Sequence, residues 1–471
     1  MESDAITVSI SKLTDHRVGS TVKIHGWAET IRVYKRHSFI ELRDGVGSIH
    51  HIQVIVPGTL SPDVTTEAYL EITGVIKELP SKAYSYQPFE LQAIKLTVLS
   101  KSEVDFPSRC PPDASAEVKL QERHLYLRDP RFALYTKARA IFMKALRKAF
   151  EKMDMTEIDP PCFVGTQCEG GATLFKLKHP GRTSEDIPAY LTQSSQFYLE
   201  YALPAIGDCF CITHSFRAEH SHTRRHLTEF LHAECEWAKI FKFEDHLDRL
   251  RRLLKLTIDY FLDYCGKYED VLTQLDLLSG IKEPSKDTGS APTGLLARVR
   301  KLRAMCDDIQ ILTHKDAIKY CREHEIYKDP ETKTHFGDRD DIPEAREREL
   351  IDQIGKIVFL VKFPREFKSF YMALDPEDPT YVLGVDVEVP GVGEVIGSGV
   401  RVSDVDTLKI RMKEEGLKEE DYKEYIDLRR YGHGKTSGMG MGVDRMLTWL
   451  LDLHSIREIV TFPRYPGHLF P

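Results

Sequence analysis

The chain has 471 residues, of which 41% are hydrophobic, and its formal net charge is −8 at pH 7. This length is too great for one hydrophobic core, so two domains are expected, and the negative charge argues against indiscriminate binding to phosphate backbones. The sequence contains no run of about twenty apolar residues, so it predicts no membrane span. The N-terminal segment MESDAITVSI lacks the features of a signal peptide, and a soluble cytoplasmic protein is therefore expected.

Residues 21–100 consist of short β-branched segments separated by turns, among them TVKIHGWAE, SFIELRDG and IHHIQVIVPG. This pattern predicts a small β-barrel, and with it an N-terminal domain over residues 1–104. The proline-rich segment DFPSRCPPD follows. Residues 105–125 are therefore predicted to form a linker or hinge to a second domain over residues 126–471.

The second domain is predicted to be α+β, with a mainly antiparallel sheet flanked by helices. Strand patterns recur in TEIDPPCFV, CFCITHSFRAE, LHAECEWAKI and YVLGVDVEVP, and an insertion without an assigned function spans about residues 274–340. Helical periodicity before them places six apolar residues on one stripe: Ala138, Phe142, Ala145, Leu146, Ala149 and Phe150. Cys209 and Cys211 alternate, which predicts one face of a strand rather than a metal site.

The segment CITHSFRAEHSHTRRHLTEFLHAECEWA places Arg217, Glu219, Arg224, Arg225 and His226 between two strand patterns. A hairpin with so many cations could hold a polyphosphate, because guanidinium groups present several fixed donors and stay charged. A solvated basic turn is the alternative interpretation of this segment.

Three alternating glycines, Gly438, Gly440 and Gly442, precede an apolar helix near the C-terminus. Glycine at every second residue clears one face of a strand, so that a nucleotide base could lie against the backbone. A helix packed closely on the sheet would need the same glycines, and the pattern alone is a weak signal.

Taken in order, TEIDPPCFV, the arginine segment and the glycine segment resemble motifs 1, 2 and 3 of the class II aminoacyl-tRNA synthetases, with Pro161 in the place of the motif 1 proline. The order of barrel, linker and catalytic domain is similar to subclass IIb, the aspartyl, asparaginyl and lysyl enzymes. The resemblance implies an N-terminal OB-fold that binds the anticodon, an antiparallel catalytic sheet and a homodimer built on motif 1.

The resemblance also implies an ATP site in which Arg217 contacts the α-phosphate and the amino-acid carboxylate. Its role would be electrostatic, so no general base is needed. Asp386 and Glu394 would coordinate Mg²⁺ against the phosphates, with a solvated edge carboxylate as the alternative for each. The further residues implied are Glu219 at the adenine amino group, Phe230 stacked on the base, Arg225 and His226 at the terminal phosphates, and Leu227, Gly442 and Arg445 around the nucleotide.

The segment QSSQFYLE bears on which amino acid is bound. In aspartyl enzymes the matching segment carries a lysine that pairs with the substrate carboxylate, and that position here is Leu199. Without this cation, the charged side chain of aspartate would lose its water shell and gain no ionic partner in return. We therefore expect aspartate to be rejected and asparagine to be accepted. Arg401 would donate to the amide oxygen, and Glu234 or Glu236 would accept from the amide nitrogen; the sequence leaves that choice open.

Four further residues complete the amino-acid site that the resemblance implies. Glu169, on a glycine-containing loop, would contact the substrate ammonium, with a plain surface turn as its alternative. Lys368 stands in FPREFKSFYM, which is closer to the asparaginyl than to the aspartyl pattern. Gln193 and Gln196 belong to the same segment as Leu199.

In the barrel, Phe39 and Gln53 stand where subclass IIb enzymes read the central anticodon uridine, by stacking and by hydrogen bonding. Arg32, with Lys35 and Arg36, would supply local positive charge. Phe39 could equally be a core residue, and the basic cluster could be a solvated loop.

These features together predict an enzyme of the asparaginyl-tRNA synthetase family. It would activate L-asparagine with ATP and transfer it to tRNA-Asn. The alternatives are an aspartyl enzyme, discriminating or not, an asparagine synthetase on the same catalytic fold, and a non-enzymatic tRNA-binding relative. Leu199 disfavours an aspartyl enzyme, and the N-terminal barrel disfavours an asparagine synthetase. The presence of Arg217, Glu394 and Arg445 disfavours a non-enzymatic relative.

Overall fold

The computed structural model describes residues 5–45, 51–79, 89–166, 168, 174–182, 185–220, 223–267, 271–279 and 294–470. The chain divides into two compact units. The first comprises Met1–Lys137, Thr273–Lys282 and Phe470–Pro471, and the second comprises Ala138–Leu272 and Glu283–Leu469. Among the helices of the described residues, none has both the length and the apolar character that a membrane span requires.

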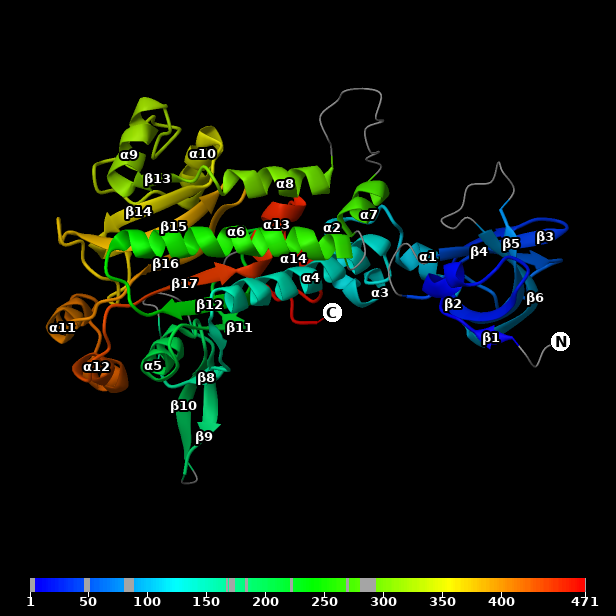
Figure 1. Ribbon diagram of the computed structural model, residues 1–471, viewed down its shortest axis with the longest axis horizontal. Coiled ribbons are helices and arrows are strands. Elements are labelled where there is room, and N and C mark those ends of the chain that lie inside the picture. Colours follow the sequence, from blue (N-terminus) through cyan, green and yellow to red (C-terminus); the bar gives the residue numbers. More distant parts are fainter. Residues whose placement is uncertain are drawn as a thin grey trace. The chain divides into compact units, whose positions relative to one another are not determined.

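The first unit contains the predicted barrel (Figure 1). Its strands follow the order β1-β2-β3-β4-β6-β5, and β5 also pairs with β2, which closes the sheet. Alternate residues of β2, such as Val22, Ile24 and Ala28, are buried, as a strand with one face towards a barrel core requires. The strands are β1 (Ile6–Thr7), β2 (Thr21–Val33), β3 (His37–Arg43), β4 (His51–Pro57), β5 (Tyr69–Glu78) and β6 (Phe89–Ser100).

Short helices precede and follow the main strands of the barrel along the chain. The segment predicted as a linker contains two of them and runs into a third. These helices are η1 (Ile10–Asp15), α1 (Phe106–Arg109), α2 (Ala116–Gln121) and α3 (Arg123–Tyr126), and α7 (Val271–Leu278) comes later in the chain.

The second unit is built on an eight-stranded sheet with the order β13-β14-β15-β16-β17-β12-β11-β7. Neighbouring strands from β14 to β11 are antiparallel, and only the edge strands β13 and β7 pair in parallel. The predicted α+β class with a mainly antiparallel sheet is therefore confirmed. The strands are β7 (Thr156–Glu157), β11 (Cys209–Phe216), β12 (Glu229–Trp237), β13 (Gln310–Thr313), β14 (Val358–Pro364), β15 (Tyr381–Val389), β16 (Gly393–Val400) and β17 (Ser437–Gly442).

One face of this sheet is covered by long helices. The six residues of the predicted stripe in α4 are all buried. Phe150 of α4 stacks on Phe210 of β11 at 4.2 Å between ring centroids, and Phe142 packs against Phe261 of α6. Phe210 faces Cys235 in the neighbouring strand, so this helical layer lies on the side of the sheet away from Glu234.

The remaining helices pack around the sheet; α9 contacts β14, α10 contacts β15 and β16, and α5 contacts β11 and β12 (Figure 1). The helices are α4 (Pro130–Lys152), α5 (Gln196–Ile206), α6 (Phe243–Lys267), α8 (Leu295–Met305), α9 (His314–Glu323), α10 (Glu344–Ile354), η2 (Arg365–Phe367), α11 (Val405–Glu414), η3 (Glu419–Tyr422), α12 (Lys423–Arg430), α13 (Val443–Leu451) and α14 (Ile456–Ile459).

The proline pair at positions 160 and 161 separates two strands that belong to different sheets. β7 joins the large sheet, whereas β8 (Phe163–Val164) joins a three-stranded sheet with β10 (Asp186–Leu191) and β9 (Lys176–Pro180). Pro160 is buried, while Pro161 and Phe163 are exposed. The prolines thus lie outside the sheet ladders, as the missing N–H requires.

Candidate active site

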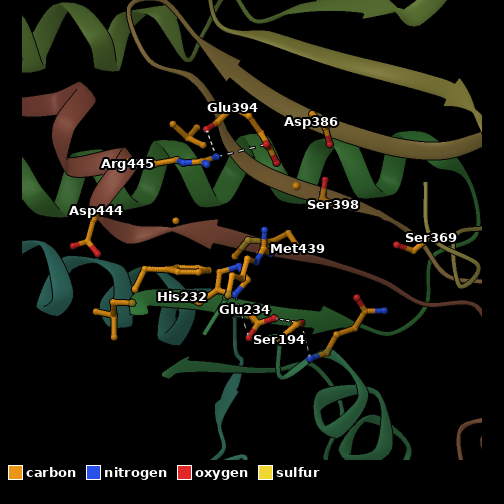
Figure 2. A pocket seen from close by; sticks show the side chains of 18 of the residues that line it. Ser194, His232, Glu234, Ser369, Asp386, Glu394, Ser398, Met439, Asp444 and Arg445 are labelled. Atoms are coloured by element: carbon orange, nitrogen blue, oxygen red, sulfur yellow. Dashed lines mark hydrogen bonds and ion pairs between the residues drawn. The ribbon is translucent and has the colours of Figure 1, made fainter. Parts of the chain in front are cut away.

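A cavity of about 440 Å³ opens on the face of the large sheet opposite α4 and α6 (Figure 2). All but two of the residues predicted to bind ATP, metal or amino acid line it: Gln196, Leu199, Arg217, Glu219, Arg225, His226, Leu227, Phe230, Glu234, Glu236, Lys368, Asp386, Glu394, Arg401, Gly442 and Arg445. Gln193 is buried and is not part of the lining. Glu169 lies outside the described residues.

Two rows of paired residues form the floor of the cavity. One row runs from Glu234 through Gly440 and Gly397 to Asp386, and the next begins with Glu236 and Gly438. Paired residues in neighbouring strands point to the same face, so glycines clear the middle of this floor.

The space above two of these glycines is already filled by protein. A Cβ atom at Gly438 would overlap Glu236 and Arg401, and a Cβ atom at Gly440 would overlap His232. The side chains of Glu236, Arg401 and His232 therefore occupy the space that these two glycines leave free.

Arg217 and Arg445 come from distant parts of the sequence and line the same cavity. Arg217 directly follows β11, and its guanidinium lies 5.5 Å from the ring of Phe230. Arg445, in the first turn of α13, donates to the backbone oxygen of Glu394 at 3.2 Å, and its Nη1 lies 3.6 Å from the Glu394 carboxylate (Figure 2). Arg225 donates to the same backbone oxygen at 3.4 Å.

The positively charged side chains around Glu394 shift the pKa of its carboxylate. Burial opposes the ionisation of Glu394, but the cations Arg445, Lys368, Arg217 and Arg225 outweigh it and lower the pKa of the group. Arginine and lysine side chains gathered around a fixed carboxylate can accept phosphate groups and a cation between them.

Asp386 and Glu394 bracket one point of the floor. A Cβ atom at Gly397 would lie 3.0 Å from Glu394 Oε1 and 4.0 Å from Asp386 Oδ1. Lys368 forms an ion pair with Asp386, and burial raises the pKa of Asp386 to about 6 against the effect of that lysine. In the described part of the chain, no three His, Cys, Asp or Glu side chains form a group that could hold a metal ion. A divalent ion here would need further oxygens, such as those of phosphates.

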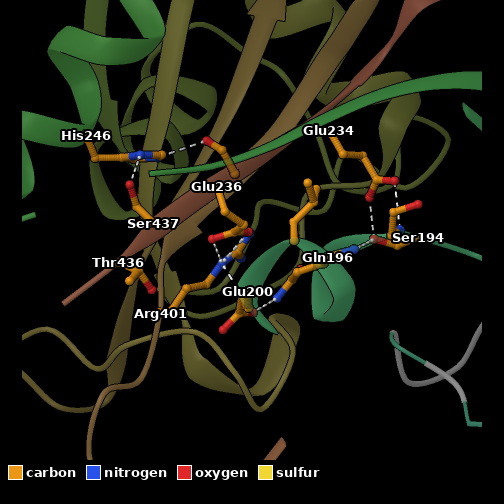
Figure 3. A network of polar contacts seen from close by, with 12 residues as sticks. Ser194, Gln196, Glu200, Glu234, Glu236, His246, Arg401, Thr436 and Ser437 are labelled. Atoms are coloured by element: carbon orange, nitrogen blue, oxygen red, sulfur yellow. Dashed lines mark hydrogen bonds and ion pairs between the residues drawn. The ribbon is translucent and has the colours of Figure 1, made fainter. Parts of the chain in front are cut away.

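At the other end of the cavity, Arg401 is paired with Glu236 (Figure 3). Arg401 Nε lies 3.1 and 3.3 Å from the two carboxylate oxygens, and Nη2 also donates to Oε1. Burial raises the pKa of Glu236 to about 8, although Arg401 opposes the shift. Glu234 instead accepts from the Ser194 hydroxyl and, at 2.8 Å, from the Ser195 backbone N–H.

Leu199 lies where the cavity meets a small apolar cluster. It is fully buried and packs against Cys209 and Cys211. These two cysteines are paired with Glu236 and Glu234 respectively, so Leu199 lies at the ends of both glutamate rows.

Several lining residues were not predicted, among them Ser194, His232, Tyr371 and Met439. His232 lies 3.1 Å from the Ser215 hydroxyl and 3.5 Å from Glu234. A signal for His232 was available, because it alternates with Phe230 and Glu234 along β12 and so shares their face.

The three residues predicted to contact the anticodon lie together on the barrel. The Arg32 guanidinium lies 5.8 Å from the ring of Phe39 and donates to the side-chain oxygen of Gln53 at 3.3 Å. Phe39 is half-buried and makes edge contacts with Tyr34 and His37. Gln53 is buried, and its amide nitrogen donates to Glu90 at 3.0 Å.

Comparison with known proteins gives concordant matches. A family model described as tRNA synthetases class II (D, K and N) matches residues 115–466. The cytoplasmic asparagine–tRNA ligase of Saccharomyces cerevisiae is 36% identical over 464 residues, covering 97% of this chain and 77% of the yeast protein. The human cytoplasmic asparagine–tRNA ligase is 34% identical over 471 residues, covering 98% of this chain and 79% of the human protein.

A solved structure is similar over nearly the whole chain. It is the asparaginyl-tRNA synthetase of Entamoeba histolytica in complex with asparaginyl-adenylate, with a TM-score of 0.82 and 32% sequence identity. The match covers 99% of this chain and 100% of the Entamoeba chain.

Proposed function

The chain belongs to the class II tRNA synthetases of the D, K and N group, and we propose that it activates L-asparagine with ATP and transfers it to the 3′ end of tRNA-Asn. The observation that carries the choice of amino acid is the pairing of Arg401 with Glu236 beside the buried Leu199. This arrangement offers one donor and one acceptor to a side chain, as a carboxamide requires.

In the first reaction the asparagine carboxylate attacks the α-phosphate of ATP, and pyrophosphate leaves. Both reactants are anions, so the cations of the cavity must offset their repulsion and the charge that develops at phosphorus. Arg217 would contact both reacting groups, Arg225 and His226 would hold the terminal phosphates, and Arg445 would cover the other side of the nucleotide. Glu219, Leu227, Phe230 and Gly442 would surround the adenosine.

Mg²⁺ would be held by Glu394 and Asp386 together with phosphate oxygens of ATP. The common point that both carboxylates reach above Gly397 supports this assignment. The ion would add positive charge at the phosphates, and Lys368 would keep Asp386 oriented through their ion pair.

Aspartate would meet a second carboxylate in this pocket and would lack a cationic partner. Its side-chain carboxylate would face Glu236 at a buried position, and Lys368 is already paired with Asp386. Above about pH 8, where Glu236 is ionised, like charges at a few ångströms in a poorly solvated site repel strongly, so aspartate should be discriminated against.

We assign tRNA recognition and assembly to other surfaces of the molecule. The group formed by Arg32, Phe39 and Gln53 supports the first unit as the anticodon-binding domain. The exposure of Pro161 and Phe163 supports a homodimer interface at motif 1. The names of the yeast and human relatives support a cytoplasmic location.

Amino-acid-dependent exchange between pyrophosphate and ATP tests the function. With asparagine, aspartate and lysine compared side by side, we expect the kcat/KM for asparagine to exceed the others by at least about a hundredfold. Exchange that depends on aspartate alone would contradict the proposal, and exchange with none of the three would contradict an activating enzyme.

Replacement of Leu199 by lysine should weaken asparagine activation about tenfold to a hundredfold without abolishing ATP binding. The new ammonium group would lie at the ends of the two glutamate rows and would engage the acceptor that the substrate amide needs. Exchange kinetics and nucleotide titration measure the two effects. Leu199→Met, which nearly conserves volume, is the matched control. Unchanged asparagine kinetics in Leu199→Lys would place this residue outside the pocket.

A further inference from the structure

A buried carboxylate lies directly behind Arg401 and is not part of the cavity lining. Glu200, in the first turns of α5, is fully buried. Figure 3 shows it between Arg401 and Gln196, two residues that do line the cavity. Gln196 donates to Glu200 Oε1 at 2.9 Å, and Arg401 Nε lies 3.9 Å from the same oxygen.

Glu200 also contacts a second buried cation, Arg429, and so connects it to Arg401 and Gln196. Arg429 of α12 donates to Glu200 Oε2 at 2.5 Å, and Tyr425 donates its hydroxyl proton to Oε1 at 2.8 Å. Arg429 is held in turn by the Val402 backbone oxygen at 3.0 Å. His433 Nε2 lies 3.5 Å from Oε2.

The four charged residues of this network are Glu200, Glu236, Arg401 and Arg429, and each is at most 5% exposed. Two are formally positive and two are negative, so the network is neutral when all four are ionised. Burial opposes the charge on Glu200, but Arg429, His433 and Arg401 outweigh it and lower the pKa of this carboxylate. Glu200 therefore stays ionised at neutral pH.

We propose that Glu200 is a specificity-determining positioning residue: its carboxylate neutralises the network behind Arg401, so that the pocket accepts a neutral carboxamide and offers no net positive charge to a second carboxylate. This inference rests on the proposed function and deepens it. Glu200 acts through Arg401 and Gln196, since it does not itself line the cavity.

The physical basis is the scarcity of water around the network. A buried charge that loses its partner is poorly screened, and an incoming ion of opposite sign is then the most effective compensation. Without the charge of Glu200, the network would hold two arginines against one glutamate. The β-carboxylate of aspartate would restore neutrality, whereas the amide of asparagine would not.

Three variants test the role of the charge: Glu200→Gln, Arg429→Met and the double variant. Their formal network charges are plus one, minus one and zero, and the double variant is thus matched in charge to the wild type. Pyrophosphate exchange would be measured with asparagine and with aspartate at pH 8.5, above the pKa of Glu236 and where histidine is largely neutral. The readout is the ratio of kcat/KM for aspartate to kcat/KM for asparagine.

We expect Glu200→Gln to raise this ratio by about tenfold to a hundredfold, and Arg429→Met not to raise it. The double variant should return to within about threefold of the wild type, because its network is neutral again. A purely structural role would make the double variant at least as abnormal as either single variant. An unchanged ratio in Glu200→Gln, or a ratio in the double variant as high as in Glu200→Gln, would overturn the inference.

If Glu200→Gln does not fold, the double variant is compared with Arg429→Met instead, since both lack Arg429. There the double variant should show a ratio about tenfold higher than Arg429→Met, and equal ratios would overturn the inference. A wild-type protein without asparagine-dependent exchange would overturn the proposed function and this inference with it. A normal wild type with equal ratios in all variants overturns the inference alone.

Discussion

Replacement of Arg217 by alanine is expected to lower asparagine-dependent pyrophosphate exchange by about a thousandfold. Arg217 lies at the cavity wall after β11, against Phe230, and its charge contributes to the low pKa of Glu394. In the proposed reaction it is the cation that bridges the attacking carboxylate and the α-phosphate. Its loss would leave the repulsion between the two anions uncompensated at the reacting centre, where a preorganised charge has its largest effect.

Arg224 provides the matched control in the same segment. Its side chain is exposed and does not line the cavity, so Arg224→Ala should retain exchange within about threefold of the wild type. Steady-state exchange at saturating asparagine and ATP measures both variants, and thermal unfolding verifies that each is folded. Equal losses in Arg217→Ala and Arg224→Ala would show that Arg217 has no special place in the reaction.

The resemblance to the class II synthetases supplied most of the candidate site residues, and the alternation of residues along strands explains why several of them lie together. Phe230, Glu234 and Glu236 lie on one face of β12, and the glycines of β17 lie beside them. The apolar stripe of α4 was equally readable, because helical periodicity reports which face packs on the sheet. The fold class followed from such local patterns.

Where the chain is irregular, spacing gives no guide to which side chains reach the site. Gln193 and Gln196 are close in sequence, but only Gln196 lines the cavity. The residues just before α5 follow neither a strand nor a helical period, so the direction of their side chains cannot be inferred from spacing.

Long-range partners were also invisible to the sequence. The choice between Glu234 and Glu236 depends on which of them meets Arg401 and which meets Ser194, contacts between residues far apart in the chain. Glu200 stands one helical turn after Gln196, a spacing that predicts their contact. Its pairing with Arg429, which gives Glu200 its charge role, required the structure.

Replacement of Glu236 by glutamine is expected to lower the kcat/KM for asparagine by about a hundredfold or more. The glutamine side chain has a single oxygen, so it cannot accept hydrogen bonds from both Arg401 and the substrate amide through separate oxygens, as the two oxygens of a carboxylate can. The pH profile provides a sharper test. Because the pKa of Glu236 is raised to about 8, the carboxylate takes up a proton as the pH falls through that value and can no longer act as a full acceptor.

The kcat/KM for asparagine in the wild type should therefore rise with pH up to about 8 and then level off, since this parameter reports the free enzyme. Glu236→Gln should lack the rise, and its relative activity with aspartate should increase because one negative charge is gone. Glu234→Gln, on the same strand face but paired with Ser194 and Ser195, should keep the rise. Exchange measured from pH 6 to pH 9 distinguishes these cases. A rise near pH 8 that persists in Glu236→Gln would mean that another group titrates and that Glu236 is not the acceptor for the amide.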